Sequence, residues 1–316
     1  MEKLLKGDYM CTCIYLKREN NYFGRNMDIH YSFNEQIINV KKGKEFVLKK
    51  SKRLKIKYSL LGIGTIINNY PLFSDVMNEK GLAIAGLNFL NNAYYFEYNK
   101  DKINITPYEL PLFLLGSCSN IDEVKNLLKN INLLNEPFSN EIPLAYLHFM
   151  VSDLERSIVI ESTKEGLHVY DNYLNVLTNN PEFSYHKNNI LNYLNLTIDD
   201  PLNEKFENIS YGQGLIGLPG DYSSMSRFVK AYFVKENIIF NDNQINQFFY
   251  CLDSVFMPLG LVKAKDGFEY TRYQSCYDLK LGIMYYKSYN DRSIKSISFN
   301  DFIRNDAIQY FKLINY

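Results

Sequence analysis

Several features that commonly point to a function are missing from this sequence of 316 residues. Tryptophan is absent, and 35 basic side chains balance 35 acidic ones, so the formal net charge is zero. A chain without excess positive charge lacks the electrostatic footprint of a nucleic-acid-binding protein. Its longest apolar runs, such as Leu112 to Leu115, are far shorter than the roughly 20 residues that cross a bilayer. We therefore expect no nucleic-acid partner and no membrane span, and we favour neutral or amphipathic substrates.

Cysteine and histidine are also few, and their spacing argues against metal sites and disulfides. The five cysteines include no close CxxC pair, so neither a disulfide framework nor a zinc site is indicated. The four histidines show no HxxxH or HExxH spacing, and each is best interpreted as a surface or satisfied core residue that tolerates substitution. A papain-like catalytic Cys–His pair remains an alternative, although no family-type signature surrounds any cysteine. The residues concerned are Cys11, Cys13, Cys118, Cys251, Cys276, His30, His148, His168 and His186.

The chain carries no sign of division into several domains. A length of 316 residues supports a large buried core, and no Pro/Gly/Ser-rich linker or repeat period separates one half from the other. The first ten residues, MEKLLKGDYM, lack the apolar core of roughly 7–15 residues that a secretory signal requires. We therefore expect a single domain in the cytoplasm.

Hydrophobic patterning predicts strands at both ends and in the middle of the chain, with a few amphipathic helices between them. Strands that do not alternate regularly with helices favour a layered α+β domain over a doubly wound sheet. The order Thr-Pro-Tyr-Glu at 106–109 is typical of a capping box with Pro in the first turn, and predicts a helix there. Expected strands are 11–16 and 22–25, which form a hairpin, and 157–162, 167–171, 175–178, 281–286 and 295–299; expected helices are 121–131, 223–236 and 242–256.

The sequence GQGLIG, from Gly212 to Gly217, satisfies the GxGxxG pattern of dinucleotide-binding folds. That fingerprint requires a strand before it and a helix that starts within it. Here Leu-Pro-Gly-Asp follows at 218–221 and imposes a turn. We therefore interpret the segment as a glycine-rich loop rather than a nucleotide site.

The segment MCTCIYLKRENNYFGRNMD, residues 10–28, places a cysteine directly after a methionine and leads through a short hairpin to Arg25 and Asp28. If Cys11 were the first residue of the mature chain, its α-amine, with a pKa near roughly 7.7, could accept the proton of its own thiol. Arg25 across the hairpin would favour the thiolate, and Asp28 could hold the α-amine by a hydrogen bond. The alternative is that Cys11, like most cysteines, is a small buried hydrophobe.

Four separated motifs follow one another along the chain: FGRNMD at 23–28, MNEKGLAIAGLNF at 77–89, VLTNNPEF at 176–183 and GLPGDYSSMSRF at 217–228. In these motifs the chain resembles the choloylglycine hydrolase family, which comprises bile salt hydrolases and penicillin V acylases. The resemblance runs from Met10 to the C-terminus. It implies an N-terminal-nucleophile hydrolase with an α+β fold, the four-layer αββα sandwich, and no metal or organic cofactor. Asn rather than Tyr at position 88 is more similar to the bile salt branch.

The resemblance also implies roles for six residues. Cys11 corresponds to the nucleophile. The backbone N–H of Asn88 and the side-chain amide of Asn179 would line the oxyanion hole, where losing one donor typically costs about 10²–10³ in rate. Arg227, in the first turn of its helix, would support the nucleophile's network. The catalytic set implied is Cys11, Arg25, Asp28, Asn88, Asn179 and Arg227.

By the same resemblance, the expected reaction is hydrolysis of a glycine- or taurine-conjugated bile salt through a thioester acyl-enzyme. Penicillin V acylases and N-acyl-homoserine-lactone acylases share every catalytic residue and remain alternatives, followed by a non-catalytic binding protein of the same fold. Segment 188–210 resembles the loop by which bile salt hydrolases form tetramers, so a homotetramer is expected. The residues expected at the substrate rim are Met27, Ile29, Phe33, Leu134 and Phe138.

Residues 1–10 depart from the family pattern, since these cytoplasmic enzymes usually have only Met before the cysteine. The nitrogen of an internal Cys11 is an amide, which cannot act as a base. We therefore expect the active domain to be 11–316. Residues 1–10 would then be either a short propeptide or residues that precede a true start at Met10.

Overall fold

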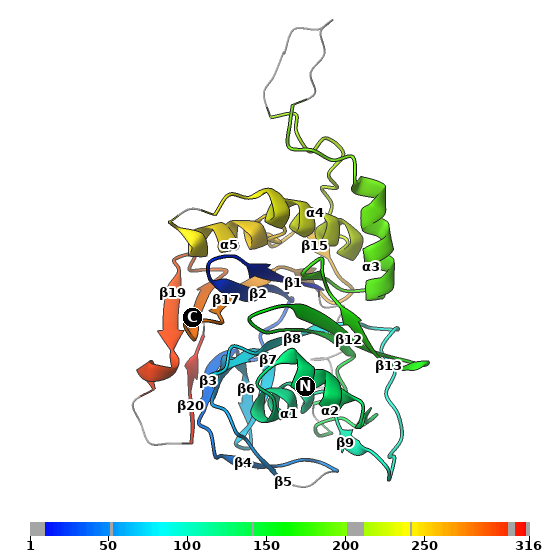
Figure 1. Cartoon of the computed structure of the whole chain (residues 1–316), viewed down its shortest axis with the longest axis vertical. Coiled ribbons are helices and arrows are strands. Elements are labelled where there is room, and N and C mark those ends of the chain that lie inside the picture. Colours follow the sequence, from blue (N-terminus) through cyan, green and yellow to red (C-terminus); the bar gives the residue numbers. More distant parts are fainter. Residues whose placement is uncertain are drawn as a thin grey trace, which may run out of the picture.

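The computed structural model describes residues 10–50, 53–140, 142–200, 212–240, 242–302 and 307–313. Two large antiparallel sheets lie face to face in it, with helices on both outer faces (Figure 1). The layers follow the order helix, sheet, sheet, helix, so the predicted α+β fold, the four-layer αββα sandwich, is confirmed. None of the helices within the described ranges is long and apolar enough to cross a membrane.

The first sheet, here called sheet A, has six strands and contains the predicted N-terminal hairpin, which is confirmed. The hairpin pairs Cys11 with Met27 and Cys13 with Arg25. Gly24 allows its second strand to lie close to the next one, since an added Cβ would stand 2.0 Å from a backbone oxygen. In spatial order the strands are β14 (Val176–Leu177), β1 (Met10–Lys17), β2 (Asn21–Asp28), β17 (Thr271–Asp278), β18 (Ile283–Ser288) and β19 (Lys295–Ser298).

The second sheet, sheet B, has eight strands and packs against sheet A through a shared apolar core. Tyr15 of sheet A and Met77, Ala85 and Met150 of sheet B are all buried in this core. In spatial order the strands are β13 (Gly166–Asp171), β12 (Ser157–Thr163), β11 (Leu147–Ser152), β8 (Ala83–Asn88), β7 (Tyr70–Asn78), β6 (Leu60–Ile67), β3 (Gln36–Val40) and β20 (Ile308–Lys312).

The helices cover the outer faces of the two sheets. α4 and α5 pack on sheet A, whereas α1 packs on sheet B, and α2 joins α1 in the same apolar cluster. The side chain of Ser223 accepts the backbone N–H of Ser226 and so caps α4. The helices are α1 (Leu110–Ser117), α2 (Ile121–Leu128), α3 (Phe183–Asn189), η1 (Ile190–Tyr193), α4 (Ser224–Asn237), α5 (Gln244–Asp253) and η2 (Phe299–Asp301).

Two local predictions, the helix start at 106–109 and the GQGLIG loop, can be compared with the structure. The carboxylate of Glu109 does accept the backbone N–H and hydroxyl of Thr106, at 2.9 and 2.7 Å, but α1 begins only at Leu110. Pro111 explains the delay, since proline is tolerated in the first turn of a helix but not deeper within it. The GQGLIG segment is a loop, as predicted, although its turn lies at 214–217 rather than at 218–221, and the next helix starts only at Ser224. The remaining short strands are β4 (Glu45–Val47), β5 (Arg53–Lys55), β9 (Ile103–Ile105), β10 (Ile131–Leu133), β15 (Val262–Lys263) and β16 (Phe268–Glu269).

Candidate active site

Cys11 lies near the start of β1, at the wall of a cavity between the sheets and their loops. Its side chain is 2% exposed, and its sulfur accepts a hydrogen bond from Nη2 of Arg25 at 2.5 Å. Burial raises the pKa of the Cys11 thiol, and the positive charge of Arg25 opposes that rise. A guanidinium in contact with a buried thiol favours the thiolate, which is the nucleophilic form.

Arg25 is fully buried and reaches from sheet A to sheet B. Its Nη1 donates to the backbone oxygens of Gly86, at 2.6 Å, and Ser74, at 3.2 Å. Behind it, the buried carboxylate of Asp75 accepts the hydroxyl groups of Tyr273 and Tyr277, at 2.5 and 2.7 Å. The guanidinium is therefore fixed by groups on both sheets rather than by the hairpin alone.

Asn179 and Arg227 contact the backbone of Cys11. The Cys11 nitrogen donates to Oδ1 of Asn179 at 2.7 Å, and Nη2 of Arg227 donates to the same oxygen at 2.8 Å. Nη1 of Arg227 also donates to the backbone oxygen of Cys11 at 2.6 Å and to Oγ1 of Thr12 at 2.7 Å. Arg227 lies in the first turn of α4, where Ser223 caps the helix. The guanidinium group of Arg227 thus fixes both the start of β1 and the Asn179 amide that accepts the Cys11 nitrogen.

The amide group of Asn179 also contacts Asn88, the last residue of β8. Nδ2 of Asn179 donates to the backbone oxygen of Asn88 at 2.9 Å, and Asn88 lines the cavity. The two residues proposed for an oxyanion hole are therefore adjacent. An amide nitrogen carries two hydrogens, so one can bond Asn88 while the other serves a second acceptor.

Asp28, at the end of β2, is buried beside this network. Its Oδ1 accepts the hydroxyl of Thr271 at 2.6 Å, whereas Oδ2 is buried without a hydrogen-bond partner among the described residues. Burial raises the pKa of Asp28 to about 6, against the charge of Arg227 and the Thr271 hydrogen bond. In this chain Met10 precedes Cys11, so the Cys11 nitrogen that donates to Asn179 belongs to a peptide bond.

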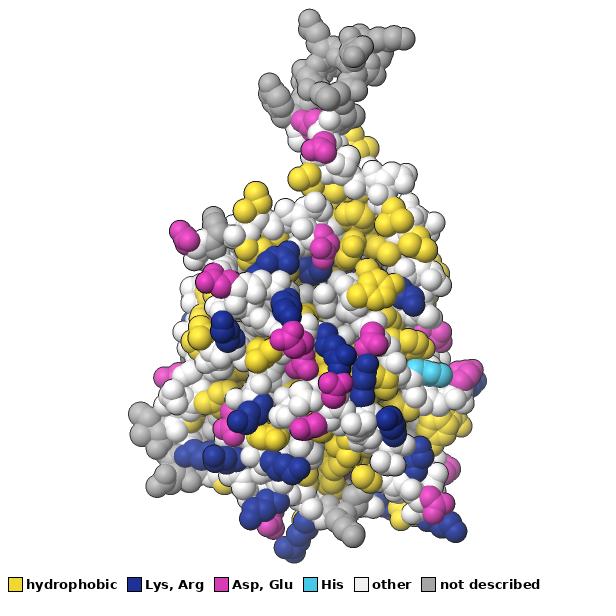
Figure 2. Space-filling view, viewed as in Figure 1, with side chains coloured by type: hydrophobic (Ala, Val, Ile, Leu, Met, Phe, Trp, Pro, Cys, Tyr) yellow, Lys and Arg dark blue, Asp and Glu magenta, His cyan; other side chains and the backbone are white. Residues whose placement is uncertain are grey.

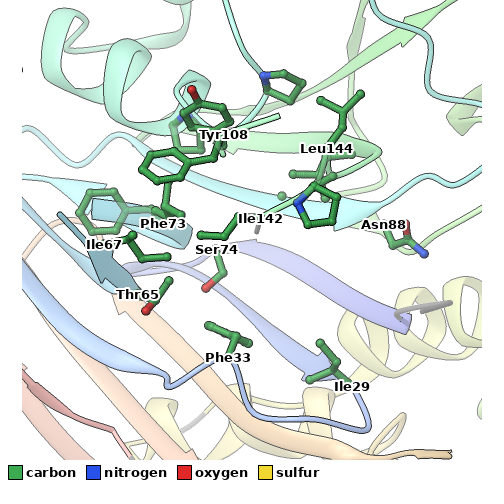
Figure 3. Close-up of a pocket in the computed structure, with 18 of the residues that line it drawn as sticks. Ile29, Phe33, Thr65, Ile67, Phe73, Ser74, Asn88, Tyr108, Ile142 and Leu144 are labelled. Carbon is green, nitrogen blue, oxygen red and sulfur yellow. The ribbon is translucent and has the colours of Figure 1, made fainter. Parts of the chain in front are cut away.

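The cavity has a volume of about 720 Å³ and mostly apolar walls. Figure 3 shows Ile29 and Phe33 on one side of it and Tyr108 and Leu144 on the other, with Asn88 toward one end. Pockets of this size bind drug-sized molecules when a few polar groups fix their orientation. Of the residues predicted at the substrate rim, Met27, Ile29, Phe33 and Phe138 line the cavity.

Leu134 does not line the cavity, contrary to expectation. It is 1% exposed, its backbone N–H donates to Ile105 at 2.9 Å, and it forms an isolated bridge with Phe96. These contacts hold it in the packed layer beside the loop, whereas Phe138 farther along reaches the cavity. No local sequence signal marks the other wall residues, which include Tyr31, Ile67, Phe73, Tyr108, Ile142 and Leu144.

No group of three or more His, Cys, Asp or Glu side chains that could hold a metal ion occurs in the described part of the chain. All five cysteines are free thiols and buried. The groups described at the site are the Cys11 thiol, the guanidinium groups of Arg25 and Arg227, the Asp28 carboxyl group and the Asn179 amide.

Known proteins are similar to this chain over most of its length. The chain is 45% identical over 316 residues to a bile salt hydrolase/transferase of Lactiplantibacillus plantarum, with 97% of this chain and 96% of that protein covered. It is 41% identical to a bile salt hydrolase/transferase of Clostridium perfringens, with 92% and 93% covered. A variant of conjugated bile acid hydrolase from Clostridium perfringens superposes with a TM-score of 0.89 at 39% identity, covering 96% and 97%.

A more distant structure shares the fold. Penicillin V acylase from Agrobacterium tumefaciens superposes with a TM-score of 0.71 at 19% identity, covering 92% of this chain and 86% of that one. The family model for linear amide C–N hydrolases, choloylglycine hydrolase family, matches residues 11–305. This chain therefore belongs to the choloylglycine hydrolase family of linear amide C–N hydrolases.

Proposed function

We propose that this chain hydrolyses the amide bond of bile salts conjugated to glycine or taurine. The observation that carries the proposal is the Cys11 sulfur, 2.5 Å from Arg25, at the wall of a mostly apolar cavity of about 720 Å³. A steroid nucleus requires such an apolar cleft with a few polar anchors. Two relatives at 45% and 41% identity are bile salt hydrolases, which supports the same substrate class here.

In the proposed reaction, the Cys11 sulfur attacks the amide carbon and the tetrahedral oxyanion forms beside Asn88 and Asn179. The Asn88 backbone N–H and the second Nδ2 hydrogen of Asn179 donate to that oxyanion. The α-amine of Cys11 takes the thiol proton and passes it to the leaving glycine or taurine. Water then hydrolyses the thioester and releases the free bile acid. Arg25 stabilises the thiolate, and Arg227 holds Asn179 in place.

The proposal requires that the active domain is 11–316. While Met10 is attached, the Cys11 nitrogen is an amide and cannot accept a proton. The Asn179 oxygen that accepts this nitrogen at 2.7 Å would also accept an α-amine, and the second oxygen of Asp28 is a further acceptor for its added hydrogens. A charged amine would stabilise the Asp28 carboxylate in return. Residues 1–10, mostly outside the described residues, would be absent from the active enzyme.

Turnover assays with a matched thiol control test the chemistry. Purified protein should release glycine from glycocholate or taurine from taurocholate, and Cys11→Ser should reduce that release by at least about 10²-fold, because the thiolate is the nucleophile. Cys118→Ser is the control, since Cys118 is an equally buried thiol outside the cavity. Equal activity of Cys11→Ser and wild type would refute the nucleophile. Preferential release of phenoxyacetate from penicillin V would instead reassign the substrate.

Intact mass and N-terminal sequencing test the start of the active chain. We expect active molecules to begin at Cys11. If fully active protein begins at Met1, an α-amine of Cys11 cannot be the base, and the proposed mechanism is wrong.

We also propose that the enzyme is a homotetramer, assembled through the chain that follows α3. This part of the molecule, here called the arm, includes Leu191, Leu194, Ile198 and Ile216. Part of the predicted segment 188–210 lies outside the described residues. In the described part of this arm, Leu191, Leu194, Ile198 and Ile216 are between 57% and 67% exposed. Figure 2 shows hydrophobic side chains gathered over this end of the molecule. Such a patch supports burial against another copy of the chain.

Five free thiols support the cytoplasmic location expected from the sequence.

Light scattering coupled to gel filtration tests the assembly. A Leu191→Glu and Leu194→Glu double variant should yield smaller particles than wild type. Ile239→Glu, which changes a residue 79% exposed beyond the end of α4, is the matched control and should leave the mass unchanged. A tetramer that survives the double variant would place the interface elsewhere.

A further inference from the structure

The segment that carries Asn179 leaves sheet A before it reaches the nucleophile. The last paired residue of β14 is Leu177, and α3 begins at Phe183, so Thr178 and Asn179 lie outside the strand pairing. Both residues are buried. Buried backbone carbonyl groups are almost always hydrogen-bonded, so these two need donors that the sheet does not supply.

Two buried imidazoles supply those donors. Nε2 of His148 lies 2.8 Å from the backbone oxygen of Thr178, and Nε2 of His186 lies 2.9 Å from that of Asn179. Because a carbonyl oxygen only accepts, each Nε2 must carry the hydrogen. Each ring is stacked on a phenylalanine, with centroids 4.3 and 4.7 Å apart, which fixes its plane. Burial lowers the pKa of His186 to about 4, so this ring is neutral at pH 7.

Glu161 orients His148 from behind. Its Oε1 lies 3.0 Å from Nδ1 of His148 and also accepts the backbone N–H of Phe183 at 2.9 Å. Glu161 and His148 face each other on the neighbouring strands β12 and β11, and both side chains are 0% exposed. The Nε2 hydrogen is committed to Thr178, and the contact of Nδ1 with Glu161 holds the other side of the ring. The chain of contacts therefore links sheet B to the segment that carries Asn179.

We propose that His148, oriented by Glu161, and His186 are positioning residues that hold Asn179 against the nitrogen of Cys11. The side-chain oxygen of Asn179 accepts this nitrogen at 2.7 Å. His148 fixes the carbonyl group that precedes Asn179, and His186 fixes the carbonyl group of Asn179 itself. The inference rests on the proposed function, in which Asn179 acts at the reacting centre. It replaces, for these two histidines, the sequence-based expectation that substitution is tolerated.

Two amide substitutions at His148 separate positioning from packing. His148→Gln places an amide N–H near the position of Nε2 and keeps a donor for Thr178, whereas His148→Asn reaches only the Nδ1 position and keeps the contact with Glu161. We expect kcat of His148→Asn to fall by about 10²-fold, the cost of a small misplacement at a reacting centre, with KM within about twofold. His148→Gln should restore kcat to within severalfold of wild type.

His168→Leu is the matched control. His168 lies on β13, the edge strand of sheet B, where it contacts Thr163 and does not touch the Asn179 segment. It should leave kcat unchanged. Equal kcat for wild type and His148→Asn would overturn the proposal, as would equal losses in the Asn and Gln variants. If His148→Asn does not fold, the same Asn and Gln pair at His186 decides. If the wild type itself releases neither glycine nor taurine, the proposed function fails, and the comparison is made on the rate of Cys11 alkylation by iodoacetamide.

Discussion

The buried carboxyl group of Asp28 should make the protein less stable as pH rises. In the folded chain burial raises the pKa of Asp28 from 3.8 to about 6. A raised pKa means that the folded state holds the proton more tightly than the unfolded state, so the stabilisation is complete below pH 3.8 and is lost as pH rises through 6. A difference of about two pKa units corresponds to about 3 kcal/mol in total. About 2 kcal/mol of this falls between pH 4.5 and 7.5.

Asp28→Asn removes this dependence, because an amide does not titrate. Urea unfolding at pH 4.5 and 7.5, on chains whose retention of Met10 is verified by mass, gives the two free energies of unfolding. The variant should gain about 2 kcal/mol relative to wild type over that interval. On chains that begin at Cys11 the variant should also lose turnover, because it removes the carboxylate proposed to accept the α-amine.

Asp221→Asn is a control of opposite sign. Hydrogen bonds from Ser226 and Ser223 lower the pKa of Asp221 to about 2, so its stabilisation is present at neutral pH and is lost as pH falls through 2. This variant should therefore gain nothing relative to wild type as pH rises. A free-energy gap between Asp28→Asn and wild type that does not change with pH would show that Asp28 ionises normally in the fold. Burial would then have no effect on the pKa of this carboxyl group.

Three further predictions follow from the same contacts. Arg25→Gln should move the pH midpoint of Cys11 alkylation upward by about 1–3 units, because the opposing charge is lost, whereas Arg25→Lys should retain most of the shift; an unchanged midpoint would contradict the pairing. Gly24→Ala should lower the melting temperature sharply, since the new Cβ would meet a carbonyl of β17, and wild-type stability would contradict the close approach. Tyr273→Phe should cost about 1–3 kcal/mol in unfolding free energy by removing a donor from buried Asp75, and no change in urea midpoint would refute that.

How much of the fold could be predicted differed between strands, and burial alone does not explain the difference, since β2 and β12 are buried throughout and were predicted. The N-terminal hairpin and the strands β12 and β13 were predicted from short strand-like runs joined by a turn. Strands β11, β8, β7, β6 and β3 of sheet B were not predicted; sheet A covers one face of these strands and helices cover the other. β6, with the sequence LLGIGTII, is therefore apolar almost throughout and gives no alternation. Such a run cannot be told from a buried helix by periodicity alone.

The candidate site divides in the same way. The chemistry around Cys11 could be argued from 19 consecutive residues, because thiol, cation and carboxylate share one hairpin. Asn179 and Arg227 could be placed only through resemblance, since an asparagine or a helix arginine carries no local signature. The cavity wall was largely out of reach, because an apolar side chain such as Phe73 or Ile142 lines a pocket for the same reason that it fills a core.

The hairpin register has a consequence for how this enzyme can change. Cys11, Arg25 and Asp28 are carried by two paired strands, so an insertion or deletion in either strand would turn alternate side chains away from the reacting centre together. Much of the cavity wall, by contrast, comes from sheet B and from the loop around Ile142. Single substitutions in the cavity wall can therefore change substrate preference, whereas the catalytic residues of the hairpin keep their geometry only together. Engineering new acyl specificity should begin on that second set of residues.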